Sequence, residues 1–103
     1  RNRLVSLPDE LTQLQELKTL IINRNMIESL PDSMGKLNKL ERIDAWDNRL
    51  YVFPQSIAKL AETLKEVDLR QIPLREEERE DMEHLLPKTK IFYTSICECS
   101  NER

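Results

Sequence analysis

Three residues of the types used in nucleophilic or metal chemistry lie near the end of the chain: His84, Cys97 and Cys99. A nucleophilic cysteine needs a positioned base, and neither cysteine has one visible in the sequence. A structural zinc site normally has four ligands with CxxC-like spacing, whereas this chain offers CxC and one distant histidine. A disulfide between the two cysteines would close a very small strained ring, so we expect free thiols or an intermolecular bridge. We therefore predict no catalytic residues, no metal site and no cofactor, and expect that the chain is not an enzyme.

The chain has one tryptophan, Trp46, between Ala45 and Asp47. A large aromatic side chain either fills a core or contacts another molecule. A glycine-rich phosphate loop is excluded, because Gly35 is the only glycine. The role of Trp46 therefore depends on the elements that position it.

The composition is that of one soluble domain: 103 residues, 39% hydrophobic and 34% charged. One glycine and five prolines disfavour a β-sandwich, whose hairpin turns need residues that tolerate positive φ. The net charge of −3 gives no reason to expect nucleic-acid binding, and no apolar run approaches the roughly 20 residues needed to span a membrane. We predict neither nucleic-acid binding nor membrane insertion.

The sequence repeats at an offset of 23 residues, with one extra residue near Ala61 in the third copy. The first type of segment reads LVSLPDELTQLQEL (4–17), IESLPDSMGKLNKL (27–40) and LYVFPQSIAKLAETL (50–64). Between these segments lie LKTLIINRNMI (17–27), LERIDAWDNRL (40–50) and LKEVDLRQIPL (64–74). A fixed period of about 20 to 29 residues is typical of stacked repeat architectures.

This pattern resembles that of the leucine-rich repeat family, whose motif is LxxLxLxxNxL, from the first residue to about Leu74. The resemblance implies an α/β fold: a right-handed solenoid with short parallel strands on its concave face and helical or 3-10 turns on its convex face. Members of this family are mostly protein-binding modules, so the resemblance also implies a protein or peptide partner.

Alternation along each strand predicts one buried stripe per repeat. Stacking places Leu20, Ile43 and Val67 in one buried column, and Ile22, Ala45 and Leu69 in the next. Asn25 and Asn48 follow the strands at a sharp bend, where a side-chain amide satisfies backbone groups that the bend leaves unpaired. Pro8, Pro31 and Pro54 suit the start of the turn on the outer face, because proline presets φ.

The two ends of the repeat array are expected to differ. Residues 1–74 are predicted to form about three repeats, the first of them truncated, residues 75–94 a C-terminal cap made of a helix and a strand, and residues 95–103 a tail. No polar cap precedes the first repeat, so its apolar edge presents a pairing hazard. We expect self-association at this edge through Leu4, Leu7, Leu11 and Leu14.

Strand alternation places Trp46 on the concave surface, and the aligned repeats predict which residues share that surface. The predicted partner-binding residues are Ile21, Asn23, Arg24, Arg42, Asp44, Trp46, Asp47, Asp68, Arg70 and Gln71. An aromatic residue rimmed by Arg and Asp is typical of an interface hot spot. In the other interpretation, Trp46 only packs over Arg42 or Arg70 and covers the sheet. Asp44 and Asp68 form a like-charge pair that could raise a pKa, with nearby arginines as the simpler explanation of their presence.

Three functional hypotheses follow. In the first, the chain binds a protein or peptide through the concave sheet around Trp46. In the second, it is the structural C-terminal end of a longer scaffold whose binding or catalytic part lies upstream. In the third, the parent protein is an enzyme in which these repeats only recognise the substrate.

Overall fold

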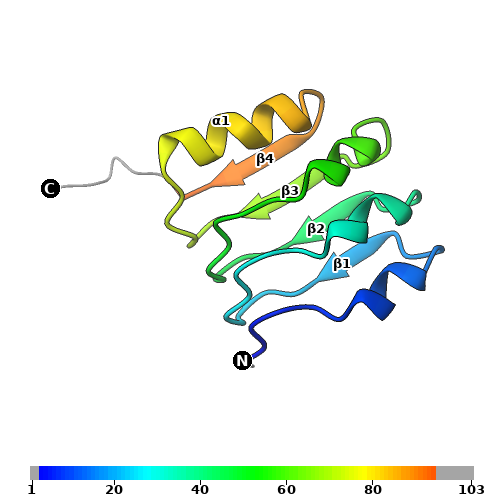
Figure 1. Cartoon of the computed structure of the whole chain (residues 1–103). Coiled ribbons are helices and arrows are strands. Elements are labelled where there is room, and N and C mark those ends of the chain that lie inside the picture. Colours follow the sequence, from blue (N-terminus) through cyan, green and yellow to red (C-terminus); the bar gives the residue numbers. More distant parts are fainter. Residues whose placement is uncertain (1–2, 95–103) are drawn as a thin grey trace, which may run out of the picture.

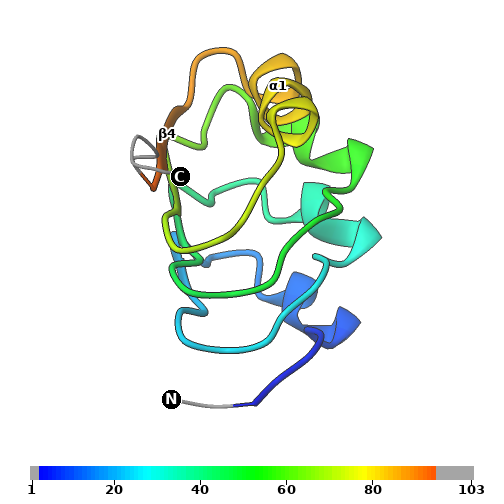
Figure 2. The same ribbon diagram turned by 90° about the vertical axis from the view of Figure 1, so that its left-hand side faces the viewer.

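The computed structural model describes residues 3–94, which form a four-stranded parallel sheet backed by helices (Figure 1). The strands are β1 (Thr19–Ile21), β2 (Arg42–Asp44), β3 (Glu66–Leu69) and β4 (Lys90–Tyr93), in spatial order β1-β2-β3-β4. Viewed from the side, the sheet runs along one face of the molecule and the helices run along the other (Figure 2). This is the right-handed α/β solenoid that the repeat pattern predicts.

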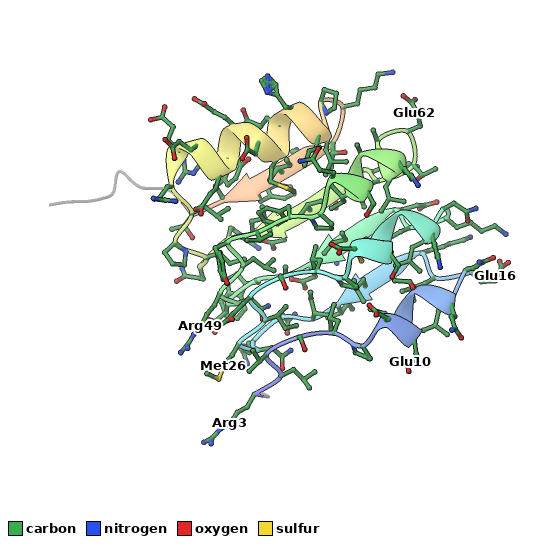
Figure 3. The ribbon with its side chains drawn as sticks, viewed as in Figure 1. Arg3, Glu10, Glu16, Met26, Arg49 and Glu62 are labelled. Carbon is green, nitrogen blue, oxygen red and sulfur yellow. The ribbon has the colours of Figure 1, made fainter. Side chains whose placement is uncertain are left out.

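The strand register confirms the predicted buried columns. Leu20 pairs with Ile43, and Ile43 with Val67. All three side chains are buried, and Ile43, in the middle of the column, is only 1% exposed. Parallel stacking at a fixed period gives every repeat the same neighbours, which is why the columns follow directly from the sequence. Arg3, Met26 and Arg49, at equivalent repeat positions, accordingly project from one edge (Figure 3).

The outer face carries three 3-10 helices, η1 (Asp9–Gln13), η2 (Asp32–Lys36) and η3 (Gln55–Leu60). Each begins directly after a proline, and Pro8, Pro31 and Pro54 have φ values of −71°, −65° and −70°. The ring of proline fixes φ in this range and has no N–H to leave unpaired, so the residue suits the start of a helix. The predicted position of these prolines is confirmed.

The bend after each of the first three strands contains one residue with a left-handed backbone. Arg24, Asp47 and Gln71 have φ values of 60°, 62° and 62°. An asparagine follows each of the first two of these residues, and its side chain forms hydrogen bonds with the nearby main chain. The Asn25 amide nitrogen donates to the carbonyl oxygens of Ile22 and Asn23. The predicted role of the asparagines, to satisfy backbone groups at the bend, is confirmed.

The last helix and strand extend the stack. Helix α1 (Glu76–Leu85) packs beside η3, and β4 adds to the sheet next to β3. Met82 and Leu86 are buried beneath the helix, and the Glu78 carboxylate accepts a hydrogen bond from the backbone N–H of Arg75. A helix and a strand therefore lie where the sequence predicts them. The division at residue 74 into repeats and cap stays a prediction, and the predicted tail, with Cys97 and Cys99, lies outside the described residues.

The first repeat leaves part of its apolar surface open. Leu4 and Leu14 are about half exposed, at 50% and 53%. Leu7 and Leu11 instead pack partly against the core. The predicted self-association surface is therefore smaller than expected, and self-association itself stays a prediction. Among residues 3–94, no helix combines the length and apolar character needed to cross a membrane.

Candidate functional site

The solvent-facing side of the four strands and of the bends that follow them is here named the sheet face. The strand register places Thr19 beside Arg42, and Arg42 beside Glu66. It also aligns Ile21, Asp44, Asp68 and Phe92 in one row across the four strands. The structure thus brings together on one face the residues that the sequence predicts there, although their role in binding a partner stays a prediction.

Trp46 lies on the sheet face, partly exposed, just beyond the end of β2. The guanidinium of Arg24 lies over its indole ring, 5.0 Å from the ring centroid. The alternative interpretation, in which Trp46 packs over Arg42 or Arg70, is wrong, because each of these arginines is paired with a carboxylate. Arg24 reaches the ring from the bend of the preceding repeat, where its left-handed backbone takes the side chain out of the strand alternation. The Arg24 stack orients the ring and leaves part of it open.

The carboxylate of Asp44 forms hydrogen bonds with the backbone of Trp46 and with the side chain of Asn23. One carboxylate oxygen accepts a hydrogen bond from the Trp46 backbone N–H at 3.3 Å, and the other accepts from the Asn23 side-chain amide at 3.0 Å. These bonds join two neighbouring repeats at the base of the indole. Asn23 and Asp44 are therefore already hydrogen-bonded within this chain. A partner could form hydrogen bonds only with their remaining lone pairs and N–H groups.

Asp68 departs from the sequence prediction, because its side chain is buried and only 8% exposed. Arg70 covers it with two charge-assisted hydrogen bonds, Nε to Oδ1 at 3.0 Å and Nη2 to Oδ2 at 2.8 Å. The Arg70 side-chain hydrogen bonds hold the pKa of Asp68 below its usual range, against the opposing effect of burial. Asp68 thus positions Arg70, and its like-charge neighbour Asp44 does not raise its pKa.

Arg42 and Glu66 form a second pair on neighbouring strands, with Nε and Oε1 3.4 Å apart. Both side chains remain more than 40% exposed, so solvent screens the pair and its contribution to stability is small. Beside them lies a shallow hollow of about 180 Å³ lined by Arg42, Glu66, Asp68, Arg70 and Phe92. The hollow is large enough for one side chain of a partner.

Strand β4 also contributes to the sheet face, which was not predicted from the sequence. Phe92 is partly exposed in the row that starts at Ile21, and the Lys90 ammonium lies 5.3 Å from the centroid of its ring. The signal for this strand was the segment KIFY (90–93), which begins three residues after Pro87. It was not found because the repeat alignment ended at Leu74, whereas the sheet continues into the segment predicted to be a cap.

Gln71 lies at the end of the sheet face, exposed, with its backbone N–H donating to the Thr94 hydroxyl. Asp47 and Arg24 take the same position in the earlier repeats. All three side chains therefore project from one row of bends, at the edge of the surface that carries Trp46.

The comparisons with known proteins agree with this architecture. The family model for leucine-rich repeats matches residues 1–50. The solved structure of the LRR protein LIC12759 of Leptospira interrogans superposes with a TM-score of 0.83 and 34% sequence identity, covering 87% of this chain and 23% of that one. No curated protein matches the sequence. This chain is a leucine-rich repeat protein. It spans about a quarter of the length of the Leptospira protein.

The charges on the sheet face of this leucine-rich repeat protein balance. The cationic side chains are Arg24, Arg42, Arg70 and Lys90, and the anionic ones are Asp44, Asp47, Glu66 and Asp68. Two pairs are already joined, and neither sign is in excess. A balanced surface exerts little long-range attraction on a charged molecule.

The side chains of the described residues that could ligate a metal ion are His84 and the carboxylates. Within residues 3–94 no group of three or more His, Cys, Asp or Glu side chains could hold a metal ion. His84 lies exposed on α1. Proteins built of leucine-rich repeats are typically scaffolds without enzymatic activity, and the arrangement of the sheet face suits contact with another surface.

Proposed function

We propose that this chain binds a protein or peptide through its sheet face, with Ile21, Trp46 and Phe92 as the apolar anchors. The observation that supports the proposal most strongly is the partly exposed indole of Trp46, held in place by Arg24 on a surface where most of the other side chains are polar. Tryptophan is enriched among the residues that dominate binding energy at protein interfaces.

The fixed geometry of these anchors favours binding. Arg24 and Asp44 restrain the Trp46 ring and backbone before any partner arrives, so less conformational entropy is lost on association. Ile21 is 63% exposed, and a partner that covers it removes apolar surface from water. A preformed, partly apolar surface therefore fits a partner segment with aliphatic or aromatic side chains.

In this proposal the charged residues of the sheet face contribute more to the orientation of the partner than to the affinity for it. Asp68 with Arg70, and Arg42 with Glu66, neutralise each other within the chain, so a partner does not have to supply a matching charge to either pair. Polar groups around an apolar centre form the rim of many interfaces and fix the register of the partner. We propose that the remaining predicted residues of the sheet face act in this way.

Selection of peptides from a random display library on the immobilised chain tests the proposal. Trp46 is the only tryptophan, so its fluorescence reports directly on burial of the sheet face. Selected peptides are expected to shift the emission to shorter wavelength, and Trp46→Ala is expected to weaken binding by about 2 kcal/mol or more. The Trp46→Ala affinity is measured with labelled peptide by fluorescence polarisation.

Tyr51→Ala is the matched control, because Tyr51 is an exposed aromatic side chain, 55% exposed, outside the sheet face. Its substitution is expected to leave affinity unchanged. Thermal unfolding of each variant separates lost binding from lost folding. The proposal is wrong if the selected peptides bind folded Trp46→Ala as tightly as the unchanged chain.

A second candidate function is the one in which this chain closes a longer repeat array and the binding part lies elsewhere. The exposed apolar side chains Leu4 and Leu14 favour it, as does the coverage of only 23% of the Leptospira protein. Unchanged partner affinity after Trp46→Ala in a longer protein containing this array would favour this alternative.

A further inference from the structure

A second surface lies away from the exposed centre of the sheet face, where the last repeat meets the final helix and strand. It is a hollow of about 290 Å³, here named the cap hollow, lined by Gln71, Ile72, Pro73, Leu74, Arg79 and Thr94. Its walls come from the bend after β3, from α1 and from the residue that follows β4. A cavity of this volume accommodates one or two side chains of a peptide.

Arg79 is the only charged residue of the cap hollow and lacks an anionic partner among residues 3–94. Its Nε atom is buried and makes no hydrogen bond within the described part of the chain. Arg79 lies in a helix whose other charged groups are mostly acidic, at positions 76, 77, 78, 80, 81 and 83, yet it forms no ion pair with them. Burial closes Nε to a partner, so the two terminal amino groups of Arg79 remain as the donors for a ligand.

The orientation of the Arg79 guanidinium follows from its packing against the ring of Tyr93. The guanidinium carbon lies 4.9 Å from the centroid of the Tyr93 ring, and the Tyr93 hydroxyl bonds the Glu83 carboxylate at 3.3 Å. Burial raises the pKa of Tyr93 to about 12, so its ring carries a neutral phenol in ordinary conditions. The ring is thus a fixed platform for the guanidinium plane, and an oriented guanidinium binds a carboxylate through two parallel hydrogen bonds.

The floor of the cap hollow is apolar. Ile72 stands where the first two bends carry asparagine. Ile72 and Leu74 are buried, and Pro73 between them is exposed. An aliphatic side chain fits against this floor, whereas a second charged group would lose hydration there without a partner.

We propose that the cap hollow binds a partner segment in which one Asp or Glu stands beside an aliphatic residue. The carboxylate accepts from the two terminal amino groups of Arg79, and the aliphatic side chain lies on Ile72, Pro73 and Leu74. The exposed carboxylates of α1 disfavour a run of acidic residues, since like charges nearby repel. One carboxylate among aliphatic neighbours is therefore the preferred ligand.

The test uses two blocked tripeptides, Leu-Glu-Leu and Leu-Gln-Leu, titrated into the ¹⁵N-labelled full chain and followed by NMR. The Nε–H of Arg79 is sheltered from solvent, so its own signal reports on the site. Leu-Glu-Leu is expected to shift this signal and the amides of Gln71, Ile72 and Leu74 saturably. Leu-Gln-Leu is expected to bind about tenfold more weakly, because it lacks the charge that pairs with the guanidinium.

Variants then separate charge from geometry. Arg79→Gln is expected to reduce affinity for Leu-Glu-Leu about tenfold, and Arg79→Lys is expected to give an intermediate loss, because an ammonium group cannot form the two parallel bonds. Lys88→Gln is the matched control: it removes one exposed positive charge outside the cap hollow, paired with Glu62, and is expected to leave affinity unchanged. Thermal unfolding confirms that each variant is folded.

Equal affinity for the two tripeptides would overturn the proposal, and so would an equal loss in Arg79→Gln and Lys88→Gln. A shift of the signals of residues 95–103 in Arg79→Gln without any peptide would also overturn it, since the occupant would then be this chain. Trp46→Ala is expected to leave tripeptide binding unchanged, so the cap hollow and the sheet face can fail independently.

Discussion

The side-chain amide of Asn48 donates a hydrogen bond of 2.8 Å to the carbonyl oxygen of Ile22 in the preceding repeat. The same amide nitrogen donates to Ala45 at 3.1 Å, and the amide oxygen accepts from the backbone N–H of Ile27 at 3.0 Å. Asn48 is only 3% exposed. One side chain therefore satisfies three buried backbone groups in two repeats.

Asn48→Ala is expected to lower the free energy of unfolding by about 3 kcal/mol, because the buried Ala45 carbonyl and Ile27 N–H lose their partner and water reaches them poorly, whereas the Ile22 carbonyl keeps its bond from Asn25. Asn25→Ala is expected to cost less, about 1 kcal/mol, since Asn25 is partly exposed and its acceptor bond from Leu4 is long, at 3.4 Å. Urea denaturation monitored by Trp46 fluorescence measures both variants. Equal losses would contradict this account of the bend.

Opposite faces of the sheet are expected to respond differently to the same substitution. Ile43→Ala removes a side chain that is 1% exposed, leaves a cavity and should cost about 2 to 5 kcal/mol. Ile21→Ala, on the sheet face, should change stability by about 0.5 kcal/mol or less. Chemical denaturation of the two variants measures the contrast. A tolerated Ile43→Ala with an unchanged denaturation midpoint would argue against the stacked core.

The pair of Asp68 and Arg70 predicts a pH dependence of stability. Asp68 has a folded pKa below its ordinary value of 3.8, so the folded state binds the proton less readily than the unfolded state. The stabilisation is complete above the unfolded pKa and is lost as pH falls through the lower folded pKa. Unfolding measured between about pH 2 and pH 7 should show this loss in the unchanged chain and a smaller loss in Asp68→Asn. Arg70→Gln should reduce the slope in the same way, and an unaltered slope in both variants would refute the assignment.

Gly35 is required by close packing between η2 and η3. A Cβ atom at this position would lie 2.8 Å from the carbonyl oxygen of Ser56 and 2.9 Å from Cδ of Lys59. Gly35→Ala should therefore lower the melting temperature and cost about 1 to 3 kcal/mol, despite the usual gain from replacing glycine. Adding Lys59→Ala is expected to recover little, because the Ser56 contact is with backbone. Full recovery would show that the lysine alone sets the constraint.

The open side of the first repeat predicts concentration-dependent association of this chain. Leu4, Val5 and Leu14 are each about half exposed, and β1 has a neighbour on one side only. Light scattering should show a mass that rises with concentration. Leu14→Lys is expected to shift the equilibrium toward monomer, because a charge in an apolar contact is costly to bury. A mass that stays monomeric at high concentration would contradict this prediction.

Much of the fold could be predicted because residues separated by one repeat in the sequence become neighbours in the stacked structure. The pairing of Leu20 with Ile43 and of Ile43 with Val67 needed only the 23-residue offset and strand alternation. The asparagines and prolines followed from backbone chemistry at known positions in the period. Each of these features depends on the main chain, whose path the period determines.

The details of the site depended on side-chain conformation and were harder to predict. Alignment placed Asn23 beside Trp46, but the left-handed backbone of Arg24 directs that residue to the indole instead. Asp68 was expected at the surface and is buried because Arg70 folds back over it. Phe92 was missed because it follows the last recognisable repeat. The 23-residue period predicts neither the side-chain rotamers nor the continuation of the sheet beyond the last repeat.

The corner after each of the first three strands adopts one backbone shape with three chemically different residues, Arg24, Asp47 and Gln71. None of these is glycine, the residue that takes this conformation at least cost. The shape is thus imposed by the stacked neighbours and does not depend on the identity of the corner residue. The side chain at this corner can consequently change during evolution while the backbone of the turn is kept. Related arrays could acquire new binding preferences through substitutions at these corner positions.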